Sequence, residues 1–169
     1  MSSSGNRSAG DVRYSAKVKT PFAVLGICTD GYALTRLTYL PRGERAHAAA
    51  DKVAELATRE LERYLADPEF RFTVPLATQG TPFQQRVWRE ISGIPLGQSR
   101  TYGEVARMVR SAPRAIGQAC GANRIALIIP CHRVVGALGS VGGFMNADEG
   151  DPIAIKRWLL IHEGYRFGA

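Results

Sequence analysis

The sequence has no long apolar stretch and few cysteines, and each shortage excludes a class of protein. No run of apolar residues in the 169-residue chain approaches the roughly 18 that a membrane-spanning helix needs. The first residues also lack the apolar segment of a secretory signal. Three cysteines are an odd number and form no disulfide framework, and no Cys/His group has zinc-site spacing. We therefore expect a cytoplasmic protein with reduced thiols, no membrane partner and no metal site.

Acidic residues are scarce in one part of the chain only. The chain has 22 basic and 15 acidic residues. Residues 1–20 hold four basic residues and one acidic residue, and residues 21–80 hold seven basic and eight acidic residues. Residues 81–169 hold eleven basic and six acidic residues, and within 86–133 there are eight arginines against two glutamates. A stretch that carries mainly positive charge is suited to contact with a phosphate backbone. On charge alone, an ordinary basic surface is an equal alternative.

The first half of the chain reads as an arm followed by a small α/β unit. Residues 1–20 are rich in Ser, Gly, Lys and Arg and predict a flexible basic arm. Two apolar segments around a Thr-Asp-Gly turn predict a hairpin over 21–40, and helical periodicity follows over 46–66. A short third strand is expected over 70–76. Residues 21–78 thus form the expected N-terminal α/β domain.

The second half, residues 79–169, is mainly helical. Thr81 and Gln84 form the pattern of a capping box with proline at the first helical position, and Thr101 and Glu104 form a second one. A further helix is expected from Pro113 to about Gly121, and a last helix begins at Asp151-Pro152. These elements predict a C-terminal domain built mostly of short helices.

Two of the short helices, on either side of residues 110–112, resemble a helix-turn-helix, in which the second helix meets DNA. Many helix pairs of this kind touch no DNA. The expected fold class is therefore α/β (α+β): a small N-terminal antiparallel-sheet-plus-helix domain, then a mainly helical, winged-helix-like domain that contains the helix-turn-helix.

Cys131 is the residue with the most reactive surroundings. A strand-like apolar run over 125–130 leads to it, His132 and Arg133 follow, and a glycine-rich stretch comes next. A free cysteine is more often an inert buried side chain, but adjacent cationic or proton-accepting groups favour the thiolate. Neighbours on a regular strand point to opposite faces. His132 therefore acts as a base for Cys131 only if the backbone turns sharply or a water bridges the two.

The run Pro130-Cys131-His132-Arg133-Val134 resembles the active-site motif of the O6-alkylguanine-DNA alkyltransferases, also called methylated-DNA–protein-cysteine methyltransferases. Further motifs occur in the family's order across about 90 residues. They are Phe83-Gln84-Gln85-Arg86-Val87-Trp88, Ile94-Pro95-Leu96-Gly97, Thr101-Tyr102-Gly103-Glu104-Val105-Ala106, Arg114-Ala115-Ile116-Gly117, Asn123, and Lys156-Arg157-Trp158-Leu159-Leu160-Ile161-His162-Glu163-Gly164. The N-terminal α/β unit suits the family's less similar first domain.

The resemblance implies DNA repair by stoichiometric transfer of an alkyl group from a flipped-out O6-alkylguanine, and as a second substrate O4-alkylthymine, to Cys131. It implies that Glu163 orients His132, and that His132 deprotonates Cys131 through water. Tyr102 matches the tyrosine whose hydroxyl bonds the flipped guanine and helps it to leave. The thioether product cannot be reversed by water, so each molecule acts once, and no cofactor is needed.

The resemblance also implies how DNA is held. Arg114 matches the arginine finger that fills the vacated stack, on a helix that enters the minor groove of double-stranded DNA, where base readout is poor. Asn123 is expected to tie this helix to the active-site strand. The remaining expected DNA contacts are Ala115, Gln118, Arg124 and Thr101, and the expected pocket and support residues are Val134, Phe144, Met145 and Trp158. The protein is expected to act as a monomer.

The chain departs from the family pattern in its substrate loop. Phe144 stands where the family usually has tyrosine, Met145 follows where a small or polar residue is usual, and about five extra residues lie within 146–152. Three of the residues in this stretch are acidic and lie near the expected DNA. The turn before Arg114 is about two residues shorter than in many relatives, and the zinc-binding residues of some relatives have no match. Substrate range is what these departures put in question.

Three alternatives remain at this point. An alkyltransferase-like protein recognises lesions without repairing them, but it lacks the reactive cysteine that this chain has. A helix-turn-helix transcription factor with an incidental cysteine gives no reason for Tyr102, His132 and Glu163 to occur together. A cysteine hydrolase would turn over and would have a pocket unrelated to DNA.

Overall fold

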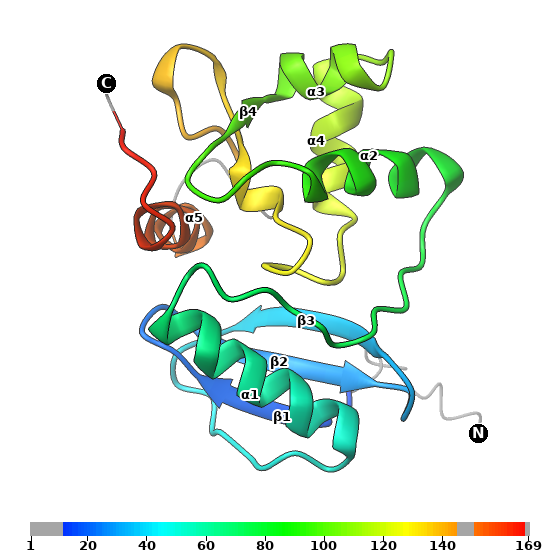
Figure 1. The fold of residues 1–169 in the computed structure, drawn as a ribbon, viewed down its shortest axis with the longest axis vertical. Helices are drawn as coiled ribbons and strands as arrows, with labels where there is room; N and C mark the ends of the chain where they lie inside the picture. The colour runs from blue at the N-terminus through cyan, green and yellow to red at the C-terminus, as the bar shows by residue number, and fades with distance from the viewer. Residues whose placement is uncertain (1–11, 145–150, 168–169) are drawn as a thin grey trace, which may run out of the picture.

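The computed structural model describes residues 12–144 and 151–167 and consists of a sheet-based N-terminal unit below a helical C-terminal unit (Figure 1). The sheet has three antiparallel strands in the order β1 (Ala16–Lys19), β2 (Val24–Thr29) and β3 (Leu34–Leu40). The hairpin and the mixed α/β fold class expected from the sequence are confirmed. The assignment of residues 16–19 to a flexible arm is wrong, because they form β1 and pair with β2 from Ala16–Ile27 to Lys19–Val24.

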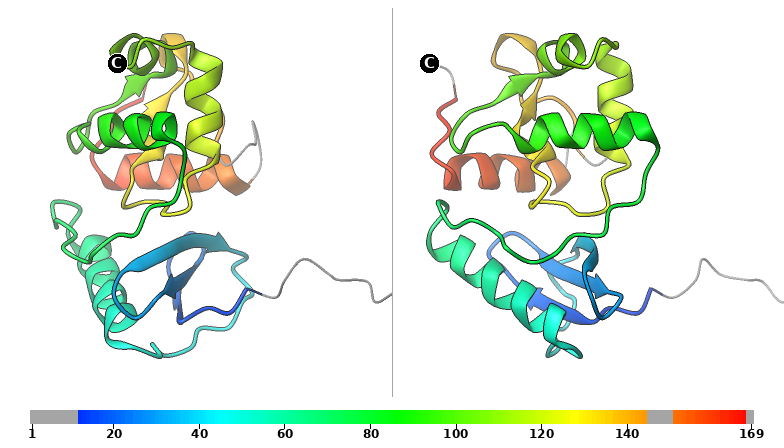
Figure 2. Two further views of the ribbon diagram at one scale, coloured as in Figure 1. Left: turned by 90° about the vertical axis from the view of Figure 1, so that its right-hand side faces the viewer. Right: turned by 45° about the vertical axis from the view of Figure 1, so that its right-hand side comes forward.

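Helix α1 (Lys52–Ala66) covers one side of this sheet, as the two views of Figure 2 show. Asp51 begins the helix, because its side chain accepts a hydrogen bond from the amide of Ala54. The helix starts later than the predicted residue 46. Its apolar stripe is buried against the sheet and includes Ala57, Leu61 and Tyr64.

The segment after α1 crosses to the C-terminal unit without forming the strand that was predicted over 70–76. It makes one bridge, between Leu76 and Leu34, with backbone hydrogen bonds at either side. Its other anchor is Glu60, a buried carboxylate that accepts bonds from the amides of Thr73 and Val74. A side chain therefore satisfies the backbone groups that a neighbouring strand would otherwise pair.

The C-terminal unit begins with α2 (Pro82–Ser92), α3 (Tyr102–Met108) and α4 (Pro113–Gly121). Both predicted capping boxes are present, at Thr81 with Gln84 and at Thr101 with Glu104. Helices α3 and α4 form the predicted helix pair around a short turn, in which Arg110 adopts a positive φ of 56°. Trp88 of α2 fastens α4 by donating a hydrogen bond from its indole nitrogen to the carbonyl of Ala119 (2.8 Å).

The remaining elements are short, apart from the last helix. Strand β4 (Arg100–Thr101) pairs in parallel with β5 (Val134–Val135), which follows the 3₁₀ helix η1 (Cys131–Arg133). A second 3₁₀ turn, η2, spans Ala137–Gly139. Helix α5 (Asp151–His162) lies along the lower edge of the C-terminal unit, facing the sheet-based unit (Figures 1 and 2).

The two units share one hydrophobic core. Backbone hydrogen bonds join β3 to the segment before Cys131, from Leu37 to the carbonyl of Arg124 (2.9 Å) and from Ala126 to that of Leu37 (3.1 Å). The ring of His162 also bonds the carbonyl of Tyr64 (2.8 Å). The N-terminal unit therefore supports the backbone around Cys131 directly. Within the described ranges, no helix has the length and apolarity to cross a bilayer.

Thr101 was expected to contact DNA, and in the structure its hydroxyl oxygen accepts the amide hydrogen of Glu104 (3.1 Å). We predict that Thr101→Ala lowers the free energy of unfolding by about 1 kcal/mol, because the first turn of α3 loses its cap. Thr101→Ser keeps the oxygen and should stay near the wild-type value. Chemical denaturation measures both variants, and equal losses in the two would contradict the capping role.

Candidate active site

The segment that leads to Cys131 turns instead of running as the predicted strand. Ile125 makes a single bridge to Leu37, after which the chain turns and Leu127 adopts a positive φ of 69°. A positive φ, which residues other than glycine rarely adopt, lies outside the extended region of backbone conformation. The chain therefore cannot continue to pair as a strand there. The turn brings residues 126 and 127 into the wall of the cavity that holds Cys131.

Helix η1 resolves the question of how Cys131 and His132 are oriented. They lie in a 3₁₀ turn and not on a strand, and both side chains are buried. Cys131 lines a cavity of about 630 Å³ that is bounded by elements of both units. The lining residues are Leu37, Thr38, Tyr39, Tyr102, Pro113, Arg114, Gly117, Cys120, Gly121, Asn123, Ala126, Leu127, Cys131, Gly143 and Phe144.

Asn123 connects the end of α4 to the reactive thiol. Its amide nitrogen donates to the carbonyl of Ile129 (3.0 Å) and to Sγ of Cys131 (3.3 Å), and its oxygen accepts from the amide of Ile125 (2.9 Å). These bonds join the end of α4 to the segment before Cys131 and to Cys131 itself.

Glu163 is the hub of the buried polar network. One carboxylate oxygen accepts from Nε2 of His132 (2.8 Å) and from the hydroxyl of Tyr64 (2.8 Å). Arg133 donates to both oxygens, from Nε (2.9 Å) and Nη2 (3.1 Å). Burial alone would raise the pKa of Glu163, but the hydrogen bonds and charges of His132 and Arg133 lower it to about 2.

The contact with Glu163 fixes the tautomer of His132. An ionised carboxylate only accepts hydrogen bonds, so Nε2 carries the proton and Nδ1 of the neutral ring has a free lone pair. Burial lowers the pKa of His132, against the opposing effect of Glu163, and this keeps the ring neutral before reaction. Among the described residues, no group bonds Nδ1. His132 is thus held as a base whose accepting nitrogen is available.

Lys156 is a site residue whose role sequence reasoning missed. Its ammonium is fully buried and donates to the carbonyls of Val134 (2.6 Å) and Gly143 (2.9 Å). It also lies over the rings of Tyr102 (5.6 Å) and Phe144 (5.8 Å). Burial lowers its pKa to about 8, while the neighbouring cysteines raise it. The available signal was a lysine within the apolar stripe of a helix, three residues before one buried leucine and four before another.

Tyr102 stands at the start of α3 and lines the cavity, as its expected role requires. Its hydroxyl donates to the carbonyl of Gly143 (2.9 Å), the same oxygen that accepts from Lys156. Gly142 has a φ of +75°, and a side chain there would lie 2.9 Å from the Tyr102 ring. A glycine is therefore required for the loop to approach this tyrosine.

Cys120 is a second thiol in the cavity wall, and no pattern in the sequence singled it out. Hydrogen bonding to Cys131 raises the pKa of Cys120, and burial raises it further. It therefore stays protonated beside the sulfur of Cys131. Both sulfurs face the charge of Lys156.

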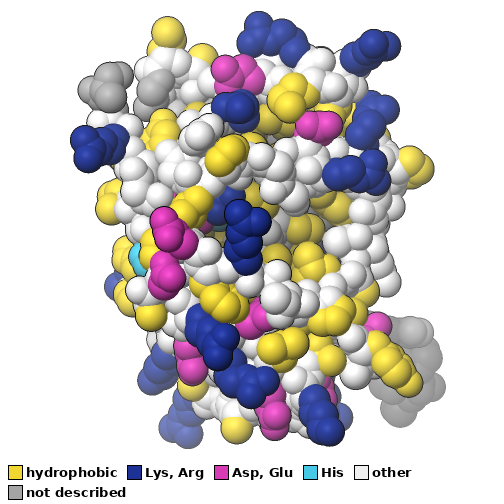
Figure 3. Space-filling model, in the orientation of Figure 1, with side chains coloured by type: hydrophobic (Ala, Val, Ile, Leu, Met, Phe, Trp, Pro, Cys, Tyr) yellow, Lys and Arg dark blue, Asp and Glu magenta, His cyan; other side chains and the backbone are white. Residues whose placement is uncertain are grey.

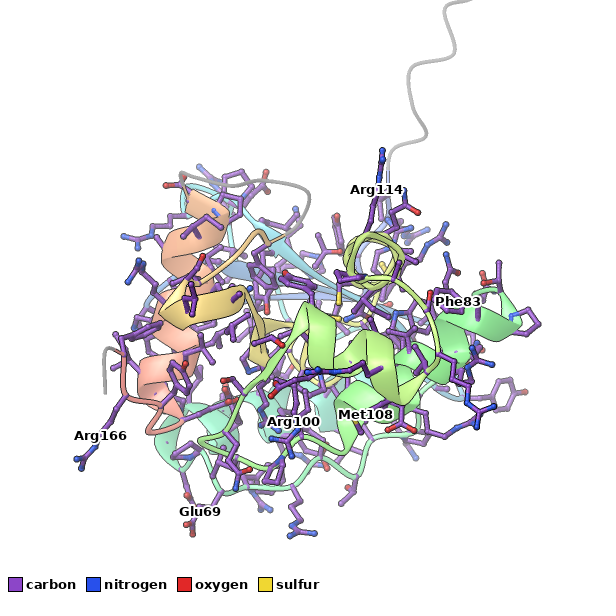
Figure 4. The ribbon with its side chains drawn as sticks, turned by 90° about the horizontal axis from the view of Figure 1, so that it is seen from above. Glu69, Phe83, Arg100, Met108, Arg114 and Arg166 are labelled. Atoms are coloured by element: carbon purple, nitrogen blue, oxygen red, sulfur yellow. The ribbon has the colours of Figure 1, made fainter. Side chains whose placement is uncertain are left out.

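The expected DNA-contacting residues occupy the outer face of α4 and its surroundings. Arg114 and Gln118 are exposed, Ala115 is half-buried and Arg124 is exposed after the helix. Figure 4 shows Arg114 extending outward from α4, away from the body of the protein, while Arg166 lies at the opposite end. Arg114 and Gly117 also border the cavity, so α4 forms part of its rim.

Basic side chains are also numerous elsewhere on the C-terminal unit. On the face in Figure 3, Lys and Arg side chains line the upper part, over α2 and α3, whereas acidic and basic groups alternate over the lower unit. The exposed arginines of α2, α3 and the turn after α3 include Arg89, Arg107 and Arg110. This distribution agrees with the charge asymmetry in the sequence.

Of the expected pocket and support residues, two do not line the Cys131 cavity. Trp158 does not line the Cys131 cavity; it stacks on His162 and packs against Phe22, beside a separate cavity of about 250 Å³. Val134 is fully buried and contributes its carbonyl to Lys156. Phe144 does line the cavity, while Met145 lies outside the described residues. Across residues 12–144 and 151–167, no group of three metal-binding side chains occurs.

A family model described as "6-O-methylguanine DNA methyltransferase, DNA binding domain" matches residues 82–165. The methylated-DNA–protein-cysteine methyltransferase of Mycobacterium tuberculosis is 40% identical over 151 residues, covering 85% of this chain and 87% of the relative. The protein of that name from Methanosarcina mazei is 36% identical, covering 85% and 92%. The chain belongs to the methylated-DNA–protein-cysteine methyltransferase family.

Solved structures of this methyltransferase family have the same fold. The M. tuberculosis protein, crystallised in complex with DNA, superimposes with a TM-score of 0.74 at 37% identity, covering 88% of this chain and 91% of that one. A Methanococcus jannaschii O6-methylguanine DNA methyltransferase gives a TM-score of 0.63 at 28% identity. Both matches cover the sheet-based unit as well as the helical one, since they span 88% and 90% of this chain.

The Glu163 network gives a prediction about stability and pH. The folded-state pKa of about 2 lies below the roughly 4.3 of an unfolded glutamate. The resulting stabilisation is complete above pH of about 4.3 and is lost as the pH falls towards 2. Glu163→Gln should therefore lower the free energy of unfolding by about 3 kcal/mol at neutral pH, and the gap should narrow in acid.

Denaturation curves at several pH values measure this gap, with Glu62→Gln on the exposed side of α1 as the matched control. The control should follow the wild type throughout. If the Glu163→Gln and wild-type stabilities stayed a constant distance apart from pH 7 to 2, Glu163 would not carry the ionised network described above.

Proposed function

We propose that the protein repairs DNA by transferring an alkyl group from O6 of a flipped-out alkylguanine, or O4 of an alkylthymine, to Sγ of Cys131. The observation that carries this proposal is the position of Cys131 in a cavity rimmed by α4, with Asn123 donating to its sulfur. A base that leaves the stack beside α4 enters this cavity and meets the thiol. The relatives' name, methylated-DNA–protein-cysteine methyltransferase, describes this reaction.

The reaction begins with the Cys131 thiol losing its proton through a water molecule to Nδ1 of His132. The resulting imidazolium is stabilised by Glu163, which already binds Nε2. The sulfur then attacks the alkyl carbon, the C–O bond breaks, and its electron pair goes to the guanine oxygen. The departing base takes a hydrogen bond from Tyr102, whose hydroxyl now donates to Gly143. The thioether is stable in water, so each molecule acts once.

DNA binding is assigned to α4, in the minor groove, with Arg114 filling the space that the flipped nucleotide leaves. Gln118, Ala115 and Arg124 are the further contacts on this face, whereas Thr101 acts through the cap of α3. Contact with the backbone and the shallow groove suits a sensor that must act in any sequence. We assign the protein a monomeric state and, because all three cysteines are free, a reducing cytoplasm.

We predict that incubation with a duplex containing one O6-methylguanine adds one methyl group to the protein, on Cys131. Intact mass and peptide mapping measure the adduct. Cys131→Ala should gain no methyl group yet bind the same duplex with an affinity close to wild type. Methyl transfer to another residue, or multiple turnover with an unmodified protein, would contradict the proposed reaction.

Arg114→Ala should slow transfer from duplex DNA about tenfold or more, because extrusion of the base costs a few kcal/mol that the arginine offsets. Transfer from the free O6-methylguanine base, which has no stack to leave, should keep its wild-type rate. Arg166→Ala removes the same charge at the far end of the molecule and is the matched control. Equal rates for Arg114→Ala and the control on duplex DNA would exclude the finger role.

A further inference from the structure

Two buried polar atoms near Cys131 have no hydrogen-bond partner within the part of the chain that the structure describes. They are the hydroxyl oxygen of Tyr39 and Nδ1 of His132. Buried polar groups are nearly always paired, since leaving one unpaired costs its full desolvation energy. Phenylalanine would pack equally well at position 39 without this cost. The hydroxyl of Tyr39 therefore requires a partner other than the protein groups that the structure describes.

Tyr39 lies on β3 of the N-terminal unit, but its side chain belongs to the reaction site. It lines the same cavity as Cys131, and its ring packs against Phe144 (5.8 Å between centroids) and Phe22 (6.2 Å). Burial raises the pKa of Tyr39, and the charges of Cys131 and Glu163 raise it further. The hydroxyl therefore remains protonated and can donate a hydrogen bond.

His132 supplies the complementary acceptor. Because its Nε2 hydrogen is committed to Glu163, Nδ1 has a lone pair and accepts. Tyr39 supplies a donor, His132 an acceptor and Cys131 a thiol, which makes three polar groups for one water. This is the number of partners that a buried water typically has.

We propose that Tyr39 is a positioning residue for the reaction: its hydroxyl and Nδ1 of His132 hold one water against the Cys131 thiol. The water accepts the thiol proton and passes one of its own to Nδ1, so it is unchanged at the end. The sulfur lone pair forms the S–C bond, and the C–O electron pair leaves with the base, which takes a proton from solvent while the thiol proton stays on His132. The inference rests on the proposed function and adds an N-terminal residue to its proton transfer.

Tyr39→Phe tests the inference, because it removes the hydroxyl and keeps the ring packing. The free protein is treated with iodoacetamide over a range of pH, and modification of Cys131 is followed by peptide mapping. The apparent pKa of this reaction should rise and its rate near neutral pH should fall about tenfold, with the wild-type rate recovered in base. Tyr32→Phe, on a tyrosine that is 86% exposed, should leave both unchanged.

Methyl transfer from an O6-methylguanine duplex is measured in parallel under single-turnover conditions. The same shift in its pH profile is expected, with unchanged duplex affinity and a thermal midpoint no lower than that of the wild type. A wild-type pH profile for Tyr39→Phe, or an equal loss of rate at every pH, would overturn the inference. If the wild type itself transferred no methyl group, the proposed function would fail, while the iodoacetamide profiles would still decide the role of Tyr39.

Discussion

The arrangement of the site depends on one buried carboxylate. Glu163, at the end of the last helix, binds Tyr64 from the N-terminal unit, His132 beside the acceptor cysteine, and Arg133. Arg133 in turn donates to the carbonyl of Ile94 (2.7 Å) and so fixes the loop after α2. Such a carboxylate is stable in the interior only because every donor around it is present. The same contacts join three distant parts of the chain and set the tautomer of His132.

A second consequence of this arrangement is that the N-terminal unit contributes to the reaction centre. Strand β3 supplies Tyr39 to the cavity and holds the segment before Cys131 through Leu37. Helix α1 supplies Tyr64 to Glu163. The family model matches residues 82–165, so the matched motifs all lie in the C-terminal unit. The side chains that surround these motifs come from both units. The sheet-based unit is thus a structural and chemical part of the acceptor site.

Local patterns in the sequence predicted the elements that depend on local interactions. The capping boxes at Thr81 and Thr101 marked helix starts because their hydrogen bonds join residues three apart. The hairpin was equally predictable from its turn. Strand β1 was missed, since four residues in a Lys- and Ser-rich segment show no pattern until β2 provides a partner. The run before Cys131 looked like a strand, but it meets β3 at one residue and then turns.

The ordered motifs contained residues that the fold brings to one cavity or one polar network, whereas the buried side chains that support them could not be predicted. The roles of Tyr64, Lys156 and Tyr39 come from contacts between residues far apart in the chain, which no local pattern encodes. Trp158, taken from a motif as a pocket residue, packs between His162 and Phe22. Motifs identify which residues a family keeps together, and the fold decides which of them face the cavity.

The most direct test of this account is the protonation of His132 in the free protein, read from the nitrogen chemical shifts of its ring by NMR at neutral pH. We expect a neutral ring with hydrogen on Nε2 and a free lone pair on Nδ1, because Glu163 accepts from Nε2. Hydrogen on Nδ1 of a neutral ring, or a charged ring throughout, would leave Cys131 without its base and would contradict the account.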